Sequence, residues 1–352
     1  MKSAQQAIFS GLDSLCAAAG EPVVNAGAPR WIRGATTDSA FLAGAQISDV
    51  FRVTPRRMIA RLDYGKRTFF STLGLQCSAP PAGLEVGEAT PGLVSVFLAE
   101  GKPRPIATPY QIKDAIELAD LDQDKSYDGH DHKVIADLFG PIEVFEGSPI
   151  EFSETWRAYY EICLGQVPSM DTWIEEATAK SLVTLTDLSG LGLPYQILCR
   201  SLFDADPGGL FLALYRCLEA LYAFTASTKV ATALRFTGPW QEVAIALEQE
   251  IGWRPREEDS LAGLFARSTE TALNKIFDCL GEARPDGDAV LAATAARRTY
   301  KLRNSLVHYR PIHHTIEHAN IDWNELCVTL SQLIREVYFD VFTAVHELKE
   351  AS

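Results

Sequence analysis

The chain has 352 residues, of which 47% are hydrophobic and 22% charged, and it carries a formal net charge of −14 at pH 7. This length and hydrophobic content predict about two folded domains and exclude an intrinsically disordered chain. The negative charge counts against a protein that coats DNA or RNA, and the absence of long uninterrupted apolar runs predicts a soluble, cytoplasmic protein without a membrane span.

The first part of the chain has the texture of a mixed α/β domain. Residues 1–20 predict an amphipathic helix, because polar and acidic positions interrupt the apolar run that a signal peptide needs. The next stretch is rich in Val, Thr, Phe and Gly, in short runs between turn residues, which is typical of strands. The expected strands lie within 49–54, 57–64, 67–75 and 92–100.

A helix is expected next, at about 109–124, where apolar residues follow a helical period. Residues 133–187 alternate short helical and strand-like pieces between prolines. The glycines of 188–209, which close with Asp-Pro-Gly-Gly, indicate a domain boundary at about residue 205. We therefore expect residues 1–205 to form a mixed α/β sensor or regulatory domain.

The second part is predicted to be a helical bundle, because apolar residues recur at three and four positions over long stretches. Helices are expected at about 208–234, after Pro239, after Ser260, at 288–309 and after Asp322. The predicted fold class is α+β, with a mixed strand-containing N-terminal domain followed by an all-α bundle over residues 206–352.

Cysteine and histidine spacing predicts neither disulfides nor a metal site. The seven cysteines are scattered and never form a CxxC arrangement, so Cys217, Cys279 and Cys327 are expected to be small core residues. His314 and His318 are four apart but lack a convincing third ligand. We therefore expect no metal and no other cofactor.

A small basic segment lies in this acidic chain. After Asp288 and up to Arg310 all charged side chains are cationic. Apart from Arg303, they are Arg297, Arg298, Lys301 and Arg310. They are candidates for contacts with RNA phosphates, and a solvated helix face is the alternative. A second basic run, 52–67, interleaves with aromatic residues. Exposed charge on a half-buried sheet is its favoured explanation, and a nucleic-acid or protein-binding surface is the alternative.

The segment 303–308 carries the residues best suited to chemistry. Asn304 and His308 are four apart and so share a helix face, and Arg303 is long enough to reach the same point. An imidazole can take a proton from a ribose 2′-hydroxyl or give one to the leaving oxygen. A guanidinium can stabilise the charge that builds on the phosphate. Arg303, Asn304 and His308 are therefore catalytic candidates for RNA cleavage without a metal, and DNA lacks the necessary hydroxyl.

The sequence RNSLVH at 303–308 resembles the Arg-x4–6-His motif of the HEPN superfamily, and LYRCLEALY at 214–222 resembles the first helix of such domains. The resemblance covers about residues 205–350. It implies a metal-independent endoribonuclease in which two protomers line one composite cleft. Arg303 and His308 match the two motif positions, Asn304 matches a frequent polar companion, and Glu219 matches a polar position of the first helix.

The resemblance also implies a biological setting. HEPN domains are common in toxin–antitoxin and antiphage systems, in which a second domain senses the trigger. The implied partners are an RNA substrate, a second copy of the chain and a trigger or antitoxin protein, with no membrane and no DNA.

Two other functions remain open at this stage. The bundle can be a non-catalytic helical module that binds a partner protein or a nucleotide, or a dimerisation element for a binding N-terminal half. His308 can then be a helix-capping histidine stabilised by the helix dipole. The nuclease requires His308 and Arg303 to be accessible and close together, whereas burial of His308 excludes it.

Overall fold

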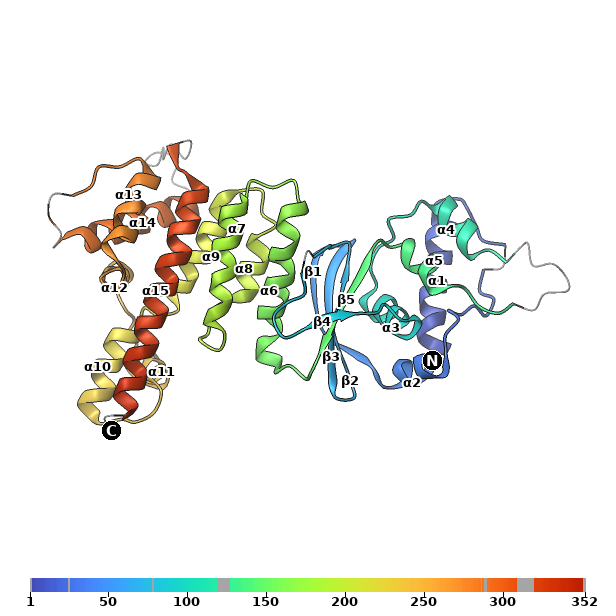
Figure 1. The fold of residues 1–352 in the computed structure, drawn as a ribbon, viewed down its shortest axis with the longest axis horizontal. Helices are drawn as coiled ribbons and strands as arrows, with labels where there is room; N and C mark the ends of the chain where they lie inside the picture. Colours follow the sequence, from blue (N-terminus) through green and yellow to red (C-terminus); the bar gives the residue numbers. More distant parts are fainter. Residues whose placement is uncertain are drawn as a thin grey trace. The chain divides into compact units, whose positions relative to one another are not determined.

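The computed structural model describes residues 2–24, 26–77, 79–118, 127–285, 287, 290–308 and 320–350. The chain forms two compact units, Met1–Ser169 and Met170–Ser352. Figure 1 shows the N-terminal unit in blue to green and the C-terminal unit in green to red. The first unit is mixed and the second is helical, so the expected α+β class is confirmed.

The two units divide between Ser169 and Met170, whereas the sequence predicts a boundary at about residue 205. The intervening segment packs with the helical unit, since the hydroxyl of Thr178 donates to the side-chain oxygen of Asn324 at 2.6 Å. Of the glycines that suggested a boundary, Gly190 and Gly192 form a turn inside this unit, and Gly208 and Gly209 lie in the first turn of a helix there. Gly190 and Gly192 there adopt φ angles of 76° and 83°, which favour glycine.

The N-terminal unit contains a five-stranded sheet with the strand order β1-β2-β3-β5-β4, in which all neighbours are antiparallel. The first three strands follow one another in the chain and form two hairpins, whereas β5 comes from much later in the chain. The elements are α1 (Lys2–Ala18), α2 (Thr36–Gly44), β1 (Gln46–Thr54), β2 (Arg57–Tyr64), β3 (Arg67–Leu73), β4 (Glu85–Gly87), α3 (Pro91–Gly101), α4 (Pro109–Ile116), α5 (His132–Asp137), β5 (Ile142–Gly147), η1 (Phe152–Glu154), α6 (Thr155–Gln166) and η2 (Val167–Ser169).

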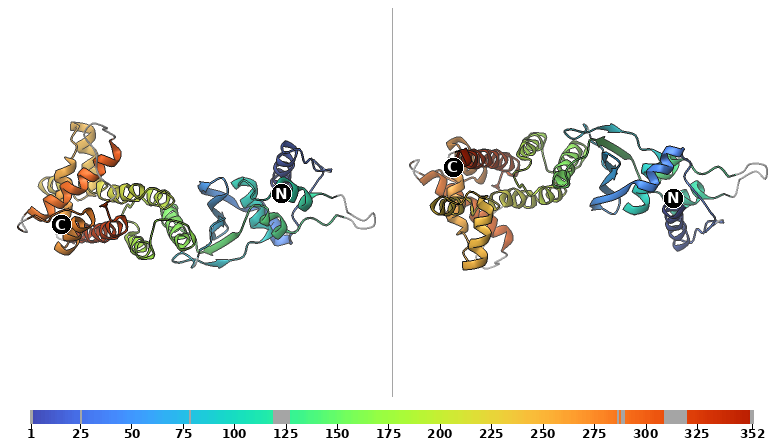
Figure 2. Two further views of the ribbon diagram at one scale, coloured as in Figure 1. Left: turned by 90° about the horizontal axis from the view of Figure 1, so that it is seen from above. Right: turned by 90° about the horizontal axis from the view of Figure 1, so that it is seen from below.

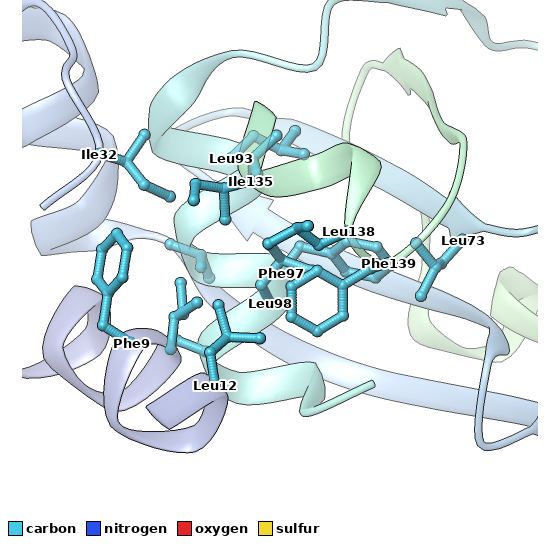
Figure 3. Packing of buried hydrophobic residues seen from close by; sticks show 14 of the residues in the cluster. Phe9, Leu12, Ile32, Leu73, Leu93, Phe97, Leu98, Ile135, Leu138 and Phe139 are labelled. Atoms are coloured by element: carbon cyan, nitrogen blue, oxygen red, sulfur yellow. The ribbon is translucent and has the colours of Figure 1, made fainter. Parts of the chain in front are cut away.

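Both faces of the sheet are covered, because successive side chains of a strand point to opposite sides. Leu62 of β2 pairs with Phe69 of β3, and both belong to the cluster formed with α1 and α3. The adjacent pair, Arg61 and Phe70, faces the other side, where Phe70 packs edge-on against Tyr159 of α6 at 5.7 Å between ring centroids. Figure 3 shows part of this cluster, in which side chains of α1, among them Leu12, lie beside those of α3, among them Phe97 and Leu98.

Residues 92–100 form helix α3, so the prediction of a strand there is wrong. Pro91 occupies the first turn, and the hydroxyl of Thr90 accepts a hydrogen bond from the backbone N–H of Leu93 at 3.3 Å. Nearly every residue of the helix is buried, so the apolar residues run all the way round it. A helix buried on every side shows no 3.6-residue period in its sequence.

The basic run 52–67 binds acceptors within its own unit. Arg61 is buried and donates to the carboxylate of Asp63 at 3.1 Å. Arg52 donates to the backbone carbonyl of Gly101, and Arg67 forms an ion pair within the sheet. These contacts favour the structural explanation of the run over a nucleic-acid surface.

His130 is held in the interior of the same unit. Its ring lies 5.0 Å from that of Phe9, and its backbone carbonyl accepts a hydrogen bond from Arg33. The side-chain Nε2 is buried without a hydrogen-bond partner among the described residues. Burial, together with the nearby guanidinium of Arg30, lowers the pKa of the imidazole from 6.5 to about 4.

This pKa makes the stability of the protein pH-dependent. Between about pH 6.5 and pH 4 the unfolded chain binds a proton at His130 that the folded chain does not. The free energy of unfolding therefore decreases as the pH is lowered through this window. The wild-type protein loses free energy of unfolding between pH 7 and pH 4.5, and we expect His130→Gln to make this loss smaller by about 1–2 kcal/mol. The effect is limited to this size because solvent screens a half-buried ring. Denaturant titrations at both pH values measure this, with His132→Gln as the control. An unchanged loss in His130→Gln would contradict it.

The described residues of the C-terminal unit form helices joined by turns and loops, with no strand among them. The apolar stretch expected as one helix over 208–234 is interrupted by a turn at 220–223, and the helix expected after Ser260 is also two helices. The elements are α7 (Glu176–Val183), η3 (Thr184–Leu188), α8 (Tyr195–Ser201), α9 (Pro207–Glu219), α10 (Phe224–Leu234), α11 (Trp240–Ile251), α12 (Glu257–Phe265), α13 (Glu270–Leu280), α14 (Leu291–Val307) and α15 (Trp323–Glu350). Figure 2 shows α10 and α11 projecting from the unit as a helical hairpin.

Helix α15 is the centre of this unit and packs against α7, α9 and α13. Its first turn is capped as expected, because the carboxylate of Asp322 accepts a backbone hydrogen bond at 3.0 Å. Leu330 and its neighbours on the expected apolar stripe are fully buried. The hydroxyl of Tyr338 donates to the backbone carbonyl of Cys217 at 2.8 Å, which ties α15 to α9.

Six of the seven cysteines are buried, as expected of small core residues. All seven are free thiols, and Cys217, Cys279 and Cys327 are buried as expected. Burial raises the pKa of the Cys279 thiol to about 11, so it stays protonated at neutral pH.

One described stretch, Pro207–Leu234, is long and apolar enough to cross a membrane by length and composition. In this structure it comprises α9, a turn and α10, and 56% of its most apolar window is buried inside the protein. A core helix of a soluble protein has the same composition, and the packing of α9 against α15 fits that explanation.

Candidate functional site

The motif segment lies on the last turns of α14. Leu302 is buried and fixes the helix against its neighbours, while the residues that follow it are half-buried or exposed. The helix ends at His308, whose backbone leaves the helical region with φ −111° and ψ 96°. The helix packs against α12, α13 and α9, so the motif is mounted on a rigid support.

Arg303 is enclosed by polar groups from three helices. Its side chain is only 19% exposed, and one terminal nitrogen donates to a carboxylate oxygen of Glu219 on α9 at 3.2 Å. The other nitrogen donates to the side-chain oxygen of Asn304 at 3.0 Å and lies 4.0 Å from a carboxylate oxygen of Glu257 on α12. The sequence suggested Glu219 as a site residue, and the structure places it against Arg303.

An aromatic pair lies beside this ion pair. The guanidinium of Arg303 is 5.9 Å from the ring centre of Tyr215, a distance at which the ring face attracts a cation. The hydroxyl of Tyr222 donates to that of Tyr215 at 2.6 Å. Burial raises the pKa of both hydroxyls, so both stay protonated at neutral pH and neither is available as a base.

His308 is exposed and differs in this respect from Arg303. Its backbone N–H donates to the carbonyl of Asn304 at 2.9 Å, which closes the last turn. Within the part of the chain that the structure describes, the imidazole forms no hydrogen bond or ion pair. The ring is therefore accessible to a ligand, as the nuclease requires, but no described contact joins it to Arg303.

The basic residues predicted to bind RNA are mostly paired with acids. Arg297 forms an ion pair with Glu258 at 3.2 Å, and Arg298 forms one with Glu282 at 2.6 Å. Lys301 is exposed and has no ion pair among the described residues. Arg310 lies outside the described residues.

Helix α12 supplies acids that sequence reasoning missed. Its first turn carries Glu257, Glu258 and Asp259, and the first two face Arg303 and Arg297 of α14. Charges at the start of a helix are a common sequence signal of helix capping, and nothing in their spacing indicates which other helix they meet. Tyr215 and Tyr222 were also missed, because apolar aromatic residues at helical spacing are read as core.

A metal ion has no evident ligand set here. Among the described residues no group of three His, Cys, Asp or Glu side chains is placed to hold one. His314 and His318, which were weighed as ligands, lie outside the described residues.

Comparison of this chain with protein-family models, with curated proteins and with solved structures finds no match.

Proposed function

We propose that the C-terminal unit is a HEPN-type endoribonuclease that cleaves RNA without a metal, with His308 and Arg303 as its catalytic residues. The observation that carries the proposal is the Arg303–Glu219 ion pair of 3.2 Å. It joins the motif helix, which ends at the exposed His308, to the helix that resembles the first HEPN helix. Two separate parts of the resemblance thus meet at one place in the fold.

The chemistry follows from the two side chains. A neutral imidazole removes the proton of a ribose 2′-hydroxyl, and the 2′-oxygen then forms a bond to phosphorus as the bond to the 5′-oxygen breaks. An imidazolium returns a proton to the leaving 5′-oxygen. The guanidinium of Arg303 stabilises the negative charge on the non-bridging oxygens, and the amide of Asn304 keeps the guanidinium in place.

A single chain supplies too few groups for this reaction. One motif provides one imidazole, whereas the reaction uses both a base and an acid. A homodimer that brings two motifs together across a two-fold axis provides both. Phosphate binding faces a separate demand, because a phosphate must compete with the carboxylates of Glu219 and Glu257 for the guanidinium of Arg303.

In this proposal the protein is a cytoplasmic effector of the toxin or antiphage-defence type. The N-terminal unit senses a trigger or binds an antitoxin protein, and RNA is the substrate.

The ion pairs of Arg303 also support a second candidate function, in which the bundle is a non-catalytic module that binds a partner protein or a nucleotide. In that case Arg303 is a structural residue.

Incubation of the purified full chain with RNA in excess chelator tests the proposal. We expect cleavage to persist and to leave a 2′,3′-cyclic phosphate and a 5′-hydroxyl, because the 2′-oxygen is the nucleophile. DNA of the same sequence, or RNA with 2′-O-methyl groups, is the matched control and should remain intact. Cleavage that depends strictly on magnesium, or products with a 5′-phosphate, would contradict the mechanism.

A further inference from the structure

The N-terminal unit contains a pocket of about 730 Å³ that the nuclease proposal does not use. It lies among the start of α1, residues 29–35, α2 and the start of α3. This volume is within the range of small-molecule sites in proteins, roughly 300–1,000 Å³. The residues that matter for its chemistry are Gln6, Arg30, Trp31, Arg33, Asp38 and Asp128.

Trp31 offers the pocket a fixed aromatic surface. Its side chain remains 39% exposed although its ring packs edge-on against Tyr127, with 4.4 Å between centroids. The indole also lies on the backbone of Gly129, where an added Cβ would be 2.6 Å from the indole nitrogen. Gly129 has a φ of 90°, so both the ring and the backbone conformation require glycine there. An exposed ring held on two sides is well suited to stacking on a flat ligand.

Arg33 is the cation that a ligand can reach. Its side chain is 55% exposed and pairs with Asp128 at 3.1 Å, whose own side chain is 79% exposed. Such an exposed pair contributes little energy, so an anionic ligand can replace the aspartate at little cost. Arg30 is not available in this way, because it is fully buried and bound to Asp13.

The other polar groups of the pocket divide into committed and uncommitted ones. The carboxylate of Asp38 accepts hydrogen bonds from the backbone N–H groups of Ala35 at 2.8 Å and Gly92 at 2.9 Å, and so holds the starts of α2 and α3. The amide of Gln6 has no hydrogen-bond partner among the described residues. It combines donor and acceptor, which suits the edge of a nucleobase.

We propose that this pocket binds a nucleoside phosphate, with the base stacked on Trp31, the phosphate paired with Arg33 and the base edge bound by Gln6. The same chemistry is present in a free nucleotide and in the 5′-phosphorylated end of an RNA chain. The proposal does not rest on the nuclease, since no residue of 303–308 contributes to it.

Isothermal titration of the full-length protein with AMP and UMP tests this binding. Adenosine and ribose 5-phosphate, which each lack one of the two groups, are the matched ligands and should bind at least about tenfold more weakly. A 5′-phosphorylated oligoribonucleotide is titrated into the His308→Ala protein, which should not cut it. Binding of AMP identifies the free nucleotide as the source, and binding of the oligonucleotide alone identifies the RNA end.

Three variants of the pocket have expected effects of different sign. Arg33→Ala and Trp31→Ala should each weaken binding about tenfold, whereas Asp128→Asn should strengthen it several-fold because the competing carboxylate is removed. Arg33 has a matched control in Arg67, which is 54% exposed and paired with Glu146. Failure of AMP, UMP and the oligonucleotide to bind at millimolar concentration would overturn the proposal. So would an equal loss in Arg67→Ala, or weaker binding by Asp128→Asn.

Discussion

His308→Ala is expected to lower the rate of RNA cleavage by about 10²–10⁴, the usual contribution of a general acid or base. The side chain is exposed and forms no hydrogen bond or ion pair with another described side chain, so its removal should leave the fold and the melting temperature unchanged. Initial rates on a labelled RNA, measured at equal protein concentration, give the ratio.

The matched control for this variant is His132→Ala, which removes a histidine from the other unit and should retain full activity. Equal rates for the wild type and His308→Ala would exclude His308 from the mechanism. A parallel loss of rate and of melting temperature would instead assign it a structural role.

Arg303→Ala is expected to lower the rate by about 10²–10³, the cost of removing one group that stabilises the transition-state charge. The free energy of unfolding should fall by no more than about 1 kcal/mol, because water can solvate the partly exposed Glu219 that remains. Arg267→Ala is the matched control, since Arg267 lies in the same unit, is also partly buried and is paired with the carboxylate of Asp340. Comparable losses of rate in the two variants would point to a general charge effect.

A mixture of the two inactive proteins tests the composite site. Chains with Arg303→Ala supply an intact histidine and chains with His308→Ala supply an intact arginine. A mixed dimer therefore has one imidazole and one guanidinium, whereas each parent dimer has only one kind, and its activity should differ from that of either parent. Mass photometry should give about twice the chain mass of 38.7 kDa. An active protein that stays monomeric in the presence of RNA would contradict the composite site.

Sequence reasoning predicted the long C-terminal helix and the three strands that form hairpins. The stripe on α15 was found because burial of one face imposes a period on the sequence. The strands β1, β2 and β3 were found from their Val, Thr and Phe content in short runs between turn residues. It was wrong for α3, which is buried on all sides, and it missed the turn at 220–223, where the run contains neither glycine nor proline. These errors arise because tertiary packing, rather than local sequence, decides such segments.

The candidate site was predicted in part. The motif and Glu219 were identified from the sequence, and the structure brings Arg303 and Glu219 together. The acids of α12 were not predicted, because Glu258 lies 39 positions from Arg297 and Glu257 lies 46 positions from Arg303, and only the packing of α12 on α14 joins them. The sequence showed a basic segment, whereas the structure shows arginines that are largely neutralised.

The hydrogen bonds between α7 and α15 determine when the helical unit can form during synthesis. The hydroxyls of Ser181 and Ser331 lie 2.7 Å apart although 150 positions separate them in the chain. At roughly 5–20 residues per second, a ribosome needs about 8–30 s to make the intervening chain. During that time α7 and α9 have no α15 to cover them, and their apolar faces are available to a chaperone. Residues 303–308 also emerge before α15, which packs against α9 and α13, two of the helices that support the motif helix.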